Sequence, residues 1–167
     1  MRNTGFLKKL AREHKISILE PSKNLTRAYL NKAQDCYESA ALLRTNRHYQ
    51  NSIIMSYYAM YNSITSILYM NGIKSSNHSG TIMLFDLLYE EKEICDIIIG
   101  AKKSRVENQY SPNKHNEEVM SELSEELIMA SGMIIRRIKT LIQANKQDDT
   151  EQRRKTLLKV LNVSNDK

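Results

Sequence analysis

The stretch Ser56-Tyr57-Tyr58-Ala59-Met60-Tyr61 lies in a segment whose apolar residues recur every three or four positions. These residues are Ile54, Tyr57, Tyr58, Tyr61, Ile64, Thr65 and Leu68. Such spacing predicts an amphipathic helix, and the pair Asn71-Gly72 commonly ends one. Tyrosine stripes at helical spacing more often belong to a protein core than to an active site. The segment therefore predicts a tyrosine-rich core helix.

The remainder of the chain contains few residues that interrupt helices, with five Gly and two Pro among 167 residues. Pro21 and Pro112 leave about ninety residues between them unbroken, a space that helices fill best. Besides the tyrosine-rich helix, the sequence predicts helices from Ser22 to Asn46, from Thr81 to about Asn108 with a break near 90–93, and from 113–116 to Gln143. We expect an all-α fold, an up-down four-helix bundle with additional short terminal helices.

This bundle is expected to span 21–144, between an N-terminal extension at 1–20 and a polar C-terminal tail at 145–167. A polar loop is expected at 74–80, between the second and third helical regions. The tail is mostly polar and carries leucines at 157, 158 and 161. It could therefore form a short amphipathic helix that docks on a partner, or stay mobile. The same two alternatives apply to the leading segment.

Composition narrows the class of protein. With 41% hydrophobic residues, a chain of this length can bury one core. No apolar run approaches the roughly 20 residues that span a bilayer, and the N-terminus has no continuous apolar region of the secretion-signal type. Cys36 and Cys95 lie in helical patterns without metal-ligand spacing, which is typical of buried thiols in a reducing compartment. We expect a cytoplasmic protein with no membrane contact, no metal and no cofactor.

The chain is basic, with a net charge of +6 and a pI of about 9.3. Lys and Arg concentrate at 2–15, at 102–105 with Lys114, and at 153–159. A nucleic-acid or phosphate-rich partner would explain this charge. A solvated basic surface would also explain it, and charge alone favours this interpretation, since Asp and Glu are interspersed throughout.

Arg105 is the most informative single residue, because it continues the apolar stripe of Ile94, Ile98 and Ala101 at the end of its helix. A guanidinium group at a helix interface needs partners. It could hold a phosphate and stabilise charge that develops during phosphodiester cleavage. It could instead extend to solvent or pair with an acidic side chain of a neighbouring helix.

Other polar residues near the ends of the helices are candidates for the same chemistry. Asn108 shares the face of Arg105 if the helix continues, and Tyr110 could bind a phosphate, stack on a base or be a half-buried boundary aromatic. His78 and His115 are candidate proton-transfer groups, because histidine titrates near neutral pH. Either could also be an ordinary polar loop residue. His14 and His48 have no supporting context.

Several of these segments occur in a recognisable order. The pattern consists of Lys32-Ala33…Ala40-Ala41-Leu42-Leu43…Tyr49, Ser56-Tyr57-Tyr58-Ala59, His78-Ser79-Gly80 and Arg105…Tyr110. From about Tyr29 to Ile142, the chain resembles the branch of the HEPN superfamily with a Tyr-Tyr-Ala segment in its second helix. In catalytic HEPN ribonucleases an arginine is followed after four to six residues by a histidine. Arg105 matches the arginine, but 106–112 contains no histidine, so His78, His115 or Tyr110 could take that role, or the chain is not a nuclease.

The resemblance implies an RNA-binding helical bundle, a homodimer in which two Arg105 segments face one cleft. As a hypothesis, the protein is a metal-independent endoribonuclease toxin paired with a nucleotidyltransferase antitoxin. Arg105, Tyr110 and His78 would be catalytic. The residues expected to bind substrate are Lys102, Lys103, Asn108 and Tyr58. The alternative is a non-catalytic module that presents substrate or nucleotide to a partner nucleotidyltransferase, and a helical interaction protein is a third possibility.

Overall fold

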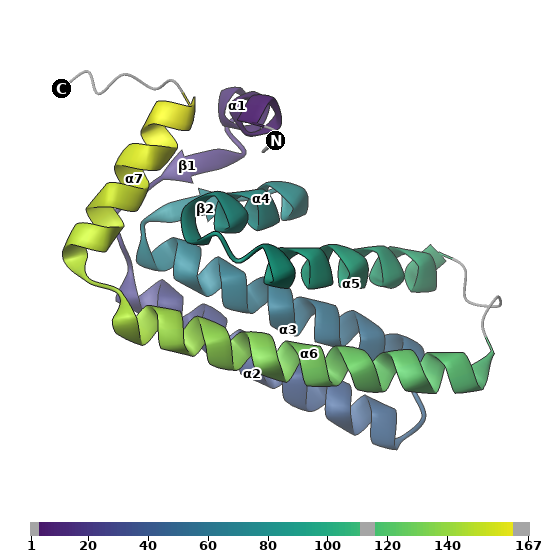
Figure 1. The fold of residues 1–167 in the computed structure, drawn as a ribbon. Coiled ribbons are helices and arrows are strands. Elements are labelled where there is room, and N and C mark those ends of the chain that lie inside the picture. Colours follow the sequence, from purple (N-terminus) through teal and green to yellow (C-terminus); the bar gives the residue numbers. More distant parts are fainter. Residues whose placement is uncertain (1–3, 111–115, 162–167) are drawn as a thin grey trace.

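A computed structural model describes residues 4–110 and 116–161, without the side chains of 108–110. Within these ranges the chain forms seven helices and two short strands (Figure 1). The elements are α1 (Thr4–Arg12), β1 (Ile16–Ile18), α2 (Lys23–Thr45), α3 (Tyr49–Met70), β2 (Ile73–Ser75), α4 (His78–Tyr89), α5 (Lys92–Tyr110), α6 (Glu117–Ala144) and α7 (Gln147–Leu161). The expected all-α bundle with additional terminal helices is confirmed.

Helix α3 is the centre of the bundle, and α2, α5 and α6 pack around it (Figure 1). One face carries large apolar side chains that are fully buried, namely Ile53, Tyr57, Met60, Ile64 and Ile67. The face toward α2 carries small residues, namely Ser52, Ser56, Ala59, Ser63 and Ser66. Small side chains let the two backbones approach closely, and Oγ of Ser52 donates to the carbonyl of Ala40 at 2.8 Å. The sequence prediction of a tyrosine-rich core helix is therefore confirmed.

Capping residues begin the long helices where the sequence predicts them. Ser22 accepts a hydrogen bond from the backbone N–H of Leu25 at 3.2 Å, and Asn116 accepts one from Glu118 at 3.0 Å. The predicted break in the third helical region is also present, because Glu90 takes a left-handed conformation with φ of 57° between α4 and α5. These local signals fix the lengths of the helices.

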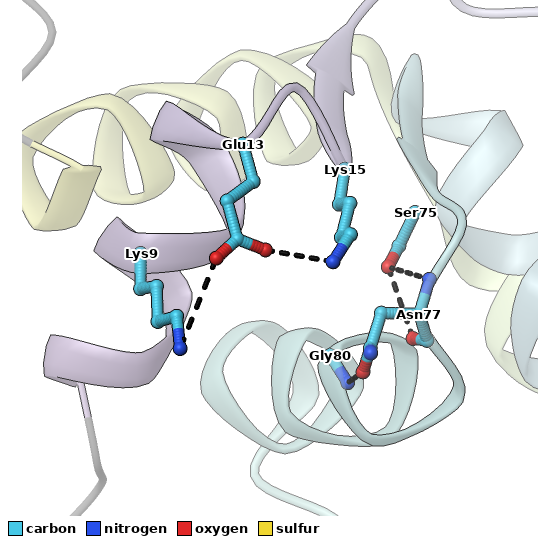
Figure 2. Close-up of polar contacts among 6 residues, drawn as sticks. All are labelled: Lys9, Glu13, Lys15, Ser75, Asn77 and Gly80. Carbon is cyan, nitrogen blue, oxygen red and sulfur yellow. Dashed lines mark hydrogen bonds and ion pairs between the residues drawn. The ribbon is translucent and has the colours of Figure 1, made fainter.

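The expected polar loop at 74–80 is wrong in part. Residues 73–75 form β2, which pairs antiparallel with β1, and Ile18 lies opposite Ile73. Three-residue strands are too short to show an alternating pattern in the sequence. Helix α4 then begins at His78 instead of Thr81, because Oδ1 of Asn77 accepts from the N–H of Gly80 at 2.9 Å (Figure 2). Oγ of Ser75 also contacts the backbone of Asn77. The turn before His78 is therefore held by the side chain of Ser75 as well as by the Asn77 cap (Figure 2).

The two terminal helices pack against each other and against the end of α4. Their buried residues include Leu7, Leu10, Leu157 and Leu161. Arg154 of α7 donates to the backbone carbonyls of Leu19 at 2.6 Å and Asn71 at 3.1 Å. The C-terminal leucines therefore dock on this chain itself. No helix within 4–110 and 116–161 combines the length and apolarity needed to cross a membrane.

Gly72 ends α3 with φ of +66°, and an added methyl group would overlap the Leu19 carbonyl and the Arg154 guanidinium. Gly72→Ala should therefore lower the free energy of unfolding by about 2–4 kcal/mol, from the left-handed backbone and the overlap together. Gly100→Ala is the matched control, because a methyl group there meets nothing within 4 Å. Within helix α5 it should stabilise by about 1 kcal/mol. Urea unfolding measures both variants, and equal stability of the two would contradict the role given to Gly72.

Candidate functional site

Three helices bring together the side chains that form a candidate site. Helix α3 contributes Tyr57 and Tyr58, the first residue of α4 is His78, and α5 contributes Lys102 and Arg105. Lys102 and Arg105 are three residues apart, so they lie on neighbouring positions of one helix face. Far apart in sequence, these five residues contact one another only because α4 and α5 both pack on α3.

Arg105 lies over the faces of two tyrosine rings. The centre of its guanidinium group is 5.2 Å from the ring centroid of Tyr57 and 5.7 Å from that of Tyr58. Its Nη1 donates to the hydroxyl oxygen of Tyr58 at 3.1 Å. Nε of Arg105 is buried and has no partner among the described residues. Cation–π contacts hold the guanidinium group in place without neutralising its charge.

Lys102 reaches the first turn of α4, where its Nζ donates to Oγ of Ser79 at 2.5 Å. The ion pairs found within 4–110 and 116–161 include neither Lys102 nor Arg105. Two cations therefore lie next to the N-terminus of α4, an end of a helix that itself favours negative charge. The expectation that Arg105 might pair with an acidic side chain of a neighbouring helix finds no support here.

His78 is enclosed by tyrosines from α3. Its Nδ1 lies 2.6 Å from the hydroxyl oxygen of Tyr57, and its ring stacks on Tyr61 with centroids 4.1 Å apart and planes 8° apart. Burial, followed by the charges of Arg105 and Lys102, lowers the pKa of His78 below its ordinary value of 6.5. The imidazole is therefore neutral at pH 7. Burial likewise raises the pKa of Tyr57 far above its ordinary value of 10.0, so its phenol stays protonated.

The combination of two uncompensated cations, a helix N-terminus and neutral hydrogen-bonding groups suits an anionic ligand. A phosphate group matches the planar fork of an arginine, with a lysine as a second point charge. Within 4–110 and 116–161, no group of three or more His, Cys, Asp and Glu residues could hold a metal ion. The geometry favours binding of an anion over binding of a cation.

The remaining candidates lie elsewhere or outside the described residues. Lys103 is exposed on the outer side of α5 and pairs with Glu107 at 3.9 Å. Tyr110 is the last residue of α5, but its side chain and that of Asn108 lie outside the described part of the chain, as does all of His115. His14 and His48 are exposed and outside the cluster.

Two members of the cluster could not be found by sequence reasoning. Ser79, the partner of Lys102, is an ordinary residue of a helix start. Tyr61 carries the flat surface on which His78 lies, yet in the sequence it belongs to a stripe typical of a core. The basic run at 102–105 and the place of Arg105 on the apolar stripe of its helix were the signals for the cationic part. The contact between Tyr57 and His78 depends instead on packing across 21 residues of sequence.

The fold agrees with comparisons to known proteins. The HEPN domain family model matches residues 26–147, most of the chain, so the chain belongs to the HEPN domain family. A curated protein named "Putative toxin MJ0605", from Methanocaldococcus jannaschii, is 24% identical over 121 residues, which cover 70% of this chain and 87% of that protein. No solved structure matches the chain significantly.

The lowered pKa of His78 predicts a contribution to the pH dependence of stability. The unfolded chain binds the proton near pH 6.5 and the folded chain only at lower pH, so protonation favours unfolding below pH 6.5. Wild type should therefore lose stability relative to His78→Gln as the pH falls from 7.5 to 5. Urea unfolding at several pH values measures this difference. A difference that stays constant over this range would contradict the burial and charge environment assigned to His78.

Proposed function

We propose that this chain is a toxin-type HEPN protein that binds RNA in the cytoplasm and cleaves it without a metal ion. The observation that carries the proposal is the environment of Arg105. Its guanidinium group is held by Tyr57 and Tyr58, has no acidic partner among the described residues, and lies near Lys102. A protein rarely retains such a cation at a helix interface without a ligand, since buried charges are normally paired.

Cleavage of an RNA phosphodiester needs stabilisation of the phosphate and movement of two protons. The 2′-oxygen bonds to phosphorus and loses its proton, while the bond to the 5′-oxygen breaks and that oxygen gains a proton. Negative charge grows on the phosphate oxygens during this step, and Arg105 with Lys102 would stabilise it. Either His78 or Tyr110 would assist proton transfer, and Tyr58 would position the guanidinium group beside the substrate.

A second function is favoured by one specific observation, which is that residues 106–112 contain no histidine. In that case the same cationic cluster would hold RNA or a nucleotide without cleaving it, for a partner nucleotidyltransferase. Under both functions we propose a nucleotidyltransferase antitoxin as the protein partner. The name of the archaeal relative, a toxin, supports the toxin-type assignment without distinguishing the two mechanisms.

We also propose that two copies associate along α5. Ile99 and Val106 lie seven residues apart on the outer side of this helix, and their exposed fractions are 53% and 37%. Pairing of two α5 helices there would bring two Arg105 segments toward one cleft.

Sedimentation equilibrium should give a mass near twice 19.4 kDa, and Ile99→Glu should reduce it to that of one chain. The control, Met129→Glu, places the same charge on an exposed residue of α6 and should leave the dimer intact.

The proposed nuclease activity predicts a strong dependence on Arg105. Arg105→Ala should reduce RNA cleavage in EDTA by about 10²–10³-fold, because a donor to the developing charge is lost. It should cost only about 2 kcal/mol of stability, the scale of two cation–π contacts and one hydrogen bond. Arg105→Lys should also be impaired, since lysine lacks the planar fork.

The matched control is Arg136→Ala, which removes an exposed arginine of α6 away from the site. It should cleave RNA and slow bacterial growth as wild type does, whereas Arg105→Ala should relieve the growth defect. Unfolding of Arg105→Ala would assign this residue to a structural network. A folded Arg105→Ala protein with wild-type toxicity would show that the site is placed wrongly. If the wild-type protein binds RNA but does not cleave it, the result would favour the non-catalytic binding module.

Binding of RNA by the cluster predicts that affinity for single-stranded RNA falls steeply with salt. Lys102→Ala should reduce the slope of log affinity against log salt by roughly one, since one phosphate contact is lost. Lys103→Ala tests whether RNA also reaches the outer side of α5, and a smaller change is expected there because Glu107 lies beside Lys103. Fluorescence anisotropy with a short RNA measures both slopes. Binding that does not change with salt would show that the basic residues are solvated surface residues and do not contact RNA phosphates.

A further inference from the structure

Tyr57 is 0% exposed, so its hydroxyl group must find a hydrogen-bond partner inside the protein. Among the described residues, that partner is Nδ1 of His78, 2.6 Å away. The contact can form in two ways, because a neutral imidazole has one N–H donor and one acceptor nitrogen. Either the phenol O–H donates to Nδ1, or an Nδ1–H group donates to the phenol oxygen.

Only the first arrangement leaves no buried donor unsatisfied. If Nδ1 carried the hydrogen, the phenol hydrogen of Tyr57 would be buried without an acceptor among the described residues, which proteins avoid. Donation by the phenol instead leaves the imidazole hydrogen on Nε2. We therefore propose that Tyr57 is a positioning residue, which holds neutral His78 in the tautomer that presents an Nε2–H donor to a phosphate group of RNA.

The second ring nitrogen is available for such a ligand. No hydrogen bond to Nε2 of His78 occurs in the described part of the chain, and the His78 side chain is only partly buried. Stacking on Tyr61 fixes the plane of the ring, so the direction of the Nε2–H group is fixed as well. The turn that carries His78 is held by the Asn77 cap (Figure 2).

Burial of His78, followed by the charges around it, keeps the imidazole in this neutral form. The titratable groups that face it are Tyr57, Tyr58 and Tyr61 from α3, and Lys102 and Arg105 from α5. Both cations oppose a charged imidazolium. The ligand in this proposal rests on the proposed function, whereas the tautomer rests on the Tyr57 contact alone.

The consequence is a specific role for His78. With Nδ1 engaged by Tyr57 and hydrogen on Nε2, the neutral ring offers no free lone pair to accept the proton of a 2′-hydroxyl group. His78 would therefore donate a hydrogen bond to a phosphate oxygen, beside the cations Lys102 and Arg105. Of the two groups proposed above for proton transfer, this role of His78 would leave Tyr110.

The tautomer can be read directly by NMR on the full chain labelled with ¹⁵N-histidine. Long-range ¹H–¹⁵N correlation distinguishes a protonated from an unprotonated ring nitrogen, and His78→Gln identifies the signals among those of the four histidines. At pH 7.5, His78 should be in the neutral Nε2–H form. Its pKa should lie below the ordinary value of 6.5. A predominantly Nδ1–H form in wild type would overturn the proposal.

Two tyrosine variants provide the matched comparison. Tyr57→Phe keeps the ring but removes the donor, so the Nδ1–H form should increase. Tyr61→Phe also keeps a ring against His78, but its lost hydroxyl contacts Thr81 at 3.3 Å, so the tautomer should not change. Equal spectra of Tyr57→Phe and wild type would overturn the role of Tyr57. If Tyr57→Phe fails to fold, the wild-type spectrum alone still decides the tautomer.

Binding of a short single-stranded RNA tests the ligand. His78→Ala should weaken binding roughly tenfold, the scale of one hydrogen bond to a charged group. His78→Gln should bind more tightly than His78→Ala, because its amide supplies an N–H donor near the position of Nε2. Wild-type affinity in both variants would overturn the donor role. A wild type with the Nε2–H form that binds no RNA would instead contradict the proposed function, while supporting the role of Tyr57.

Discussion

Helix α3 is buried on almost every side, and this burial places the main constraint on the rest of the molecule. Most of its buried polar groups find partners within the protein, because water does not reach them, although Oγ of Ser56 has none among the described residues. Ser52 bonds to a carbonyl of α2, and the Tyr57 hydroxyl reaches His78 at the start of α4. The second contact fixes the first turn of α4 against the centre of the bundle. The candidate site therefore exists because a buried phenol needs an acceptor.

The same helix also explains how a cation can lie at a helix interface without an acidic partner. The tyrosine faces of α3 attract the guanidinium group of Arg105, and the hydroxyl of Tyr58 accepts one of its hydrogen bonds. These contacts stabilise the position of the charge but leave it available to a ligand. Lys102, three residues earlier on α5, adds a second cation beside the first turn of α4. Membership of the HEPN domain family gives this arrangement a biological context, in which RNA is the ligand we propose.

The sequence was sufficient for those features that are encoded locally. Ser22 and Asn116 are residues that cap helices, Gly72 supplies the left-handed conformation that ends α3, and apolar spacing identified the long helices. The paired strands β1 and β2 could not be predicted, since three residues carry no measurable alternation. For the site, the basic run at 102–105 and the place of Arg105 on the apolar stripe of its helix indicated the cationic part. The stacking of His78 on Tyr61 and the docking of α7 on α1 depend on long-range packing, which one sequence does not specify.

In the proposed function, the guanidinium group of Arg105 has no acidic partner among the described residues and binds an RNA phosphate. Its Nε–H signal in a ¹H–¹⁵N spectrum, assigned by comparison with Arg105→Lys, reports this group directly. During titration with a short single-stranded RNA, that signal should shift saturably, with the same dissociation constant as an independent binding measurement. An unchanged Arg105 signal at saturating RNA would contradict this role of Arg105, because the RNA would then be bound elsewhere on the basic surface.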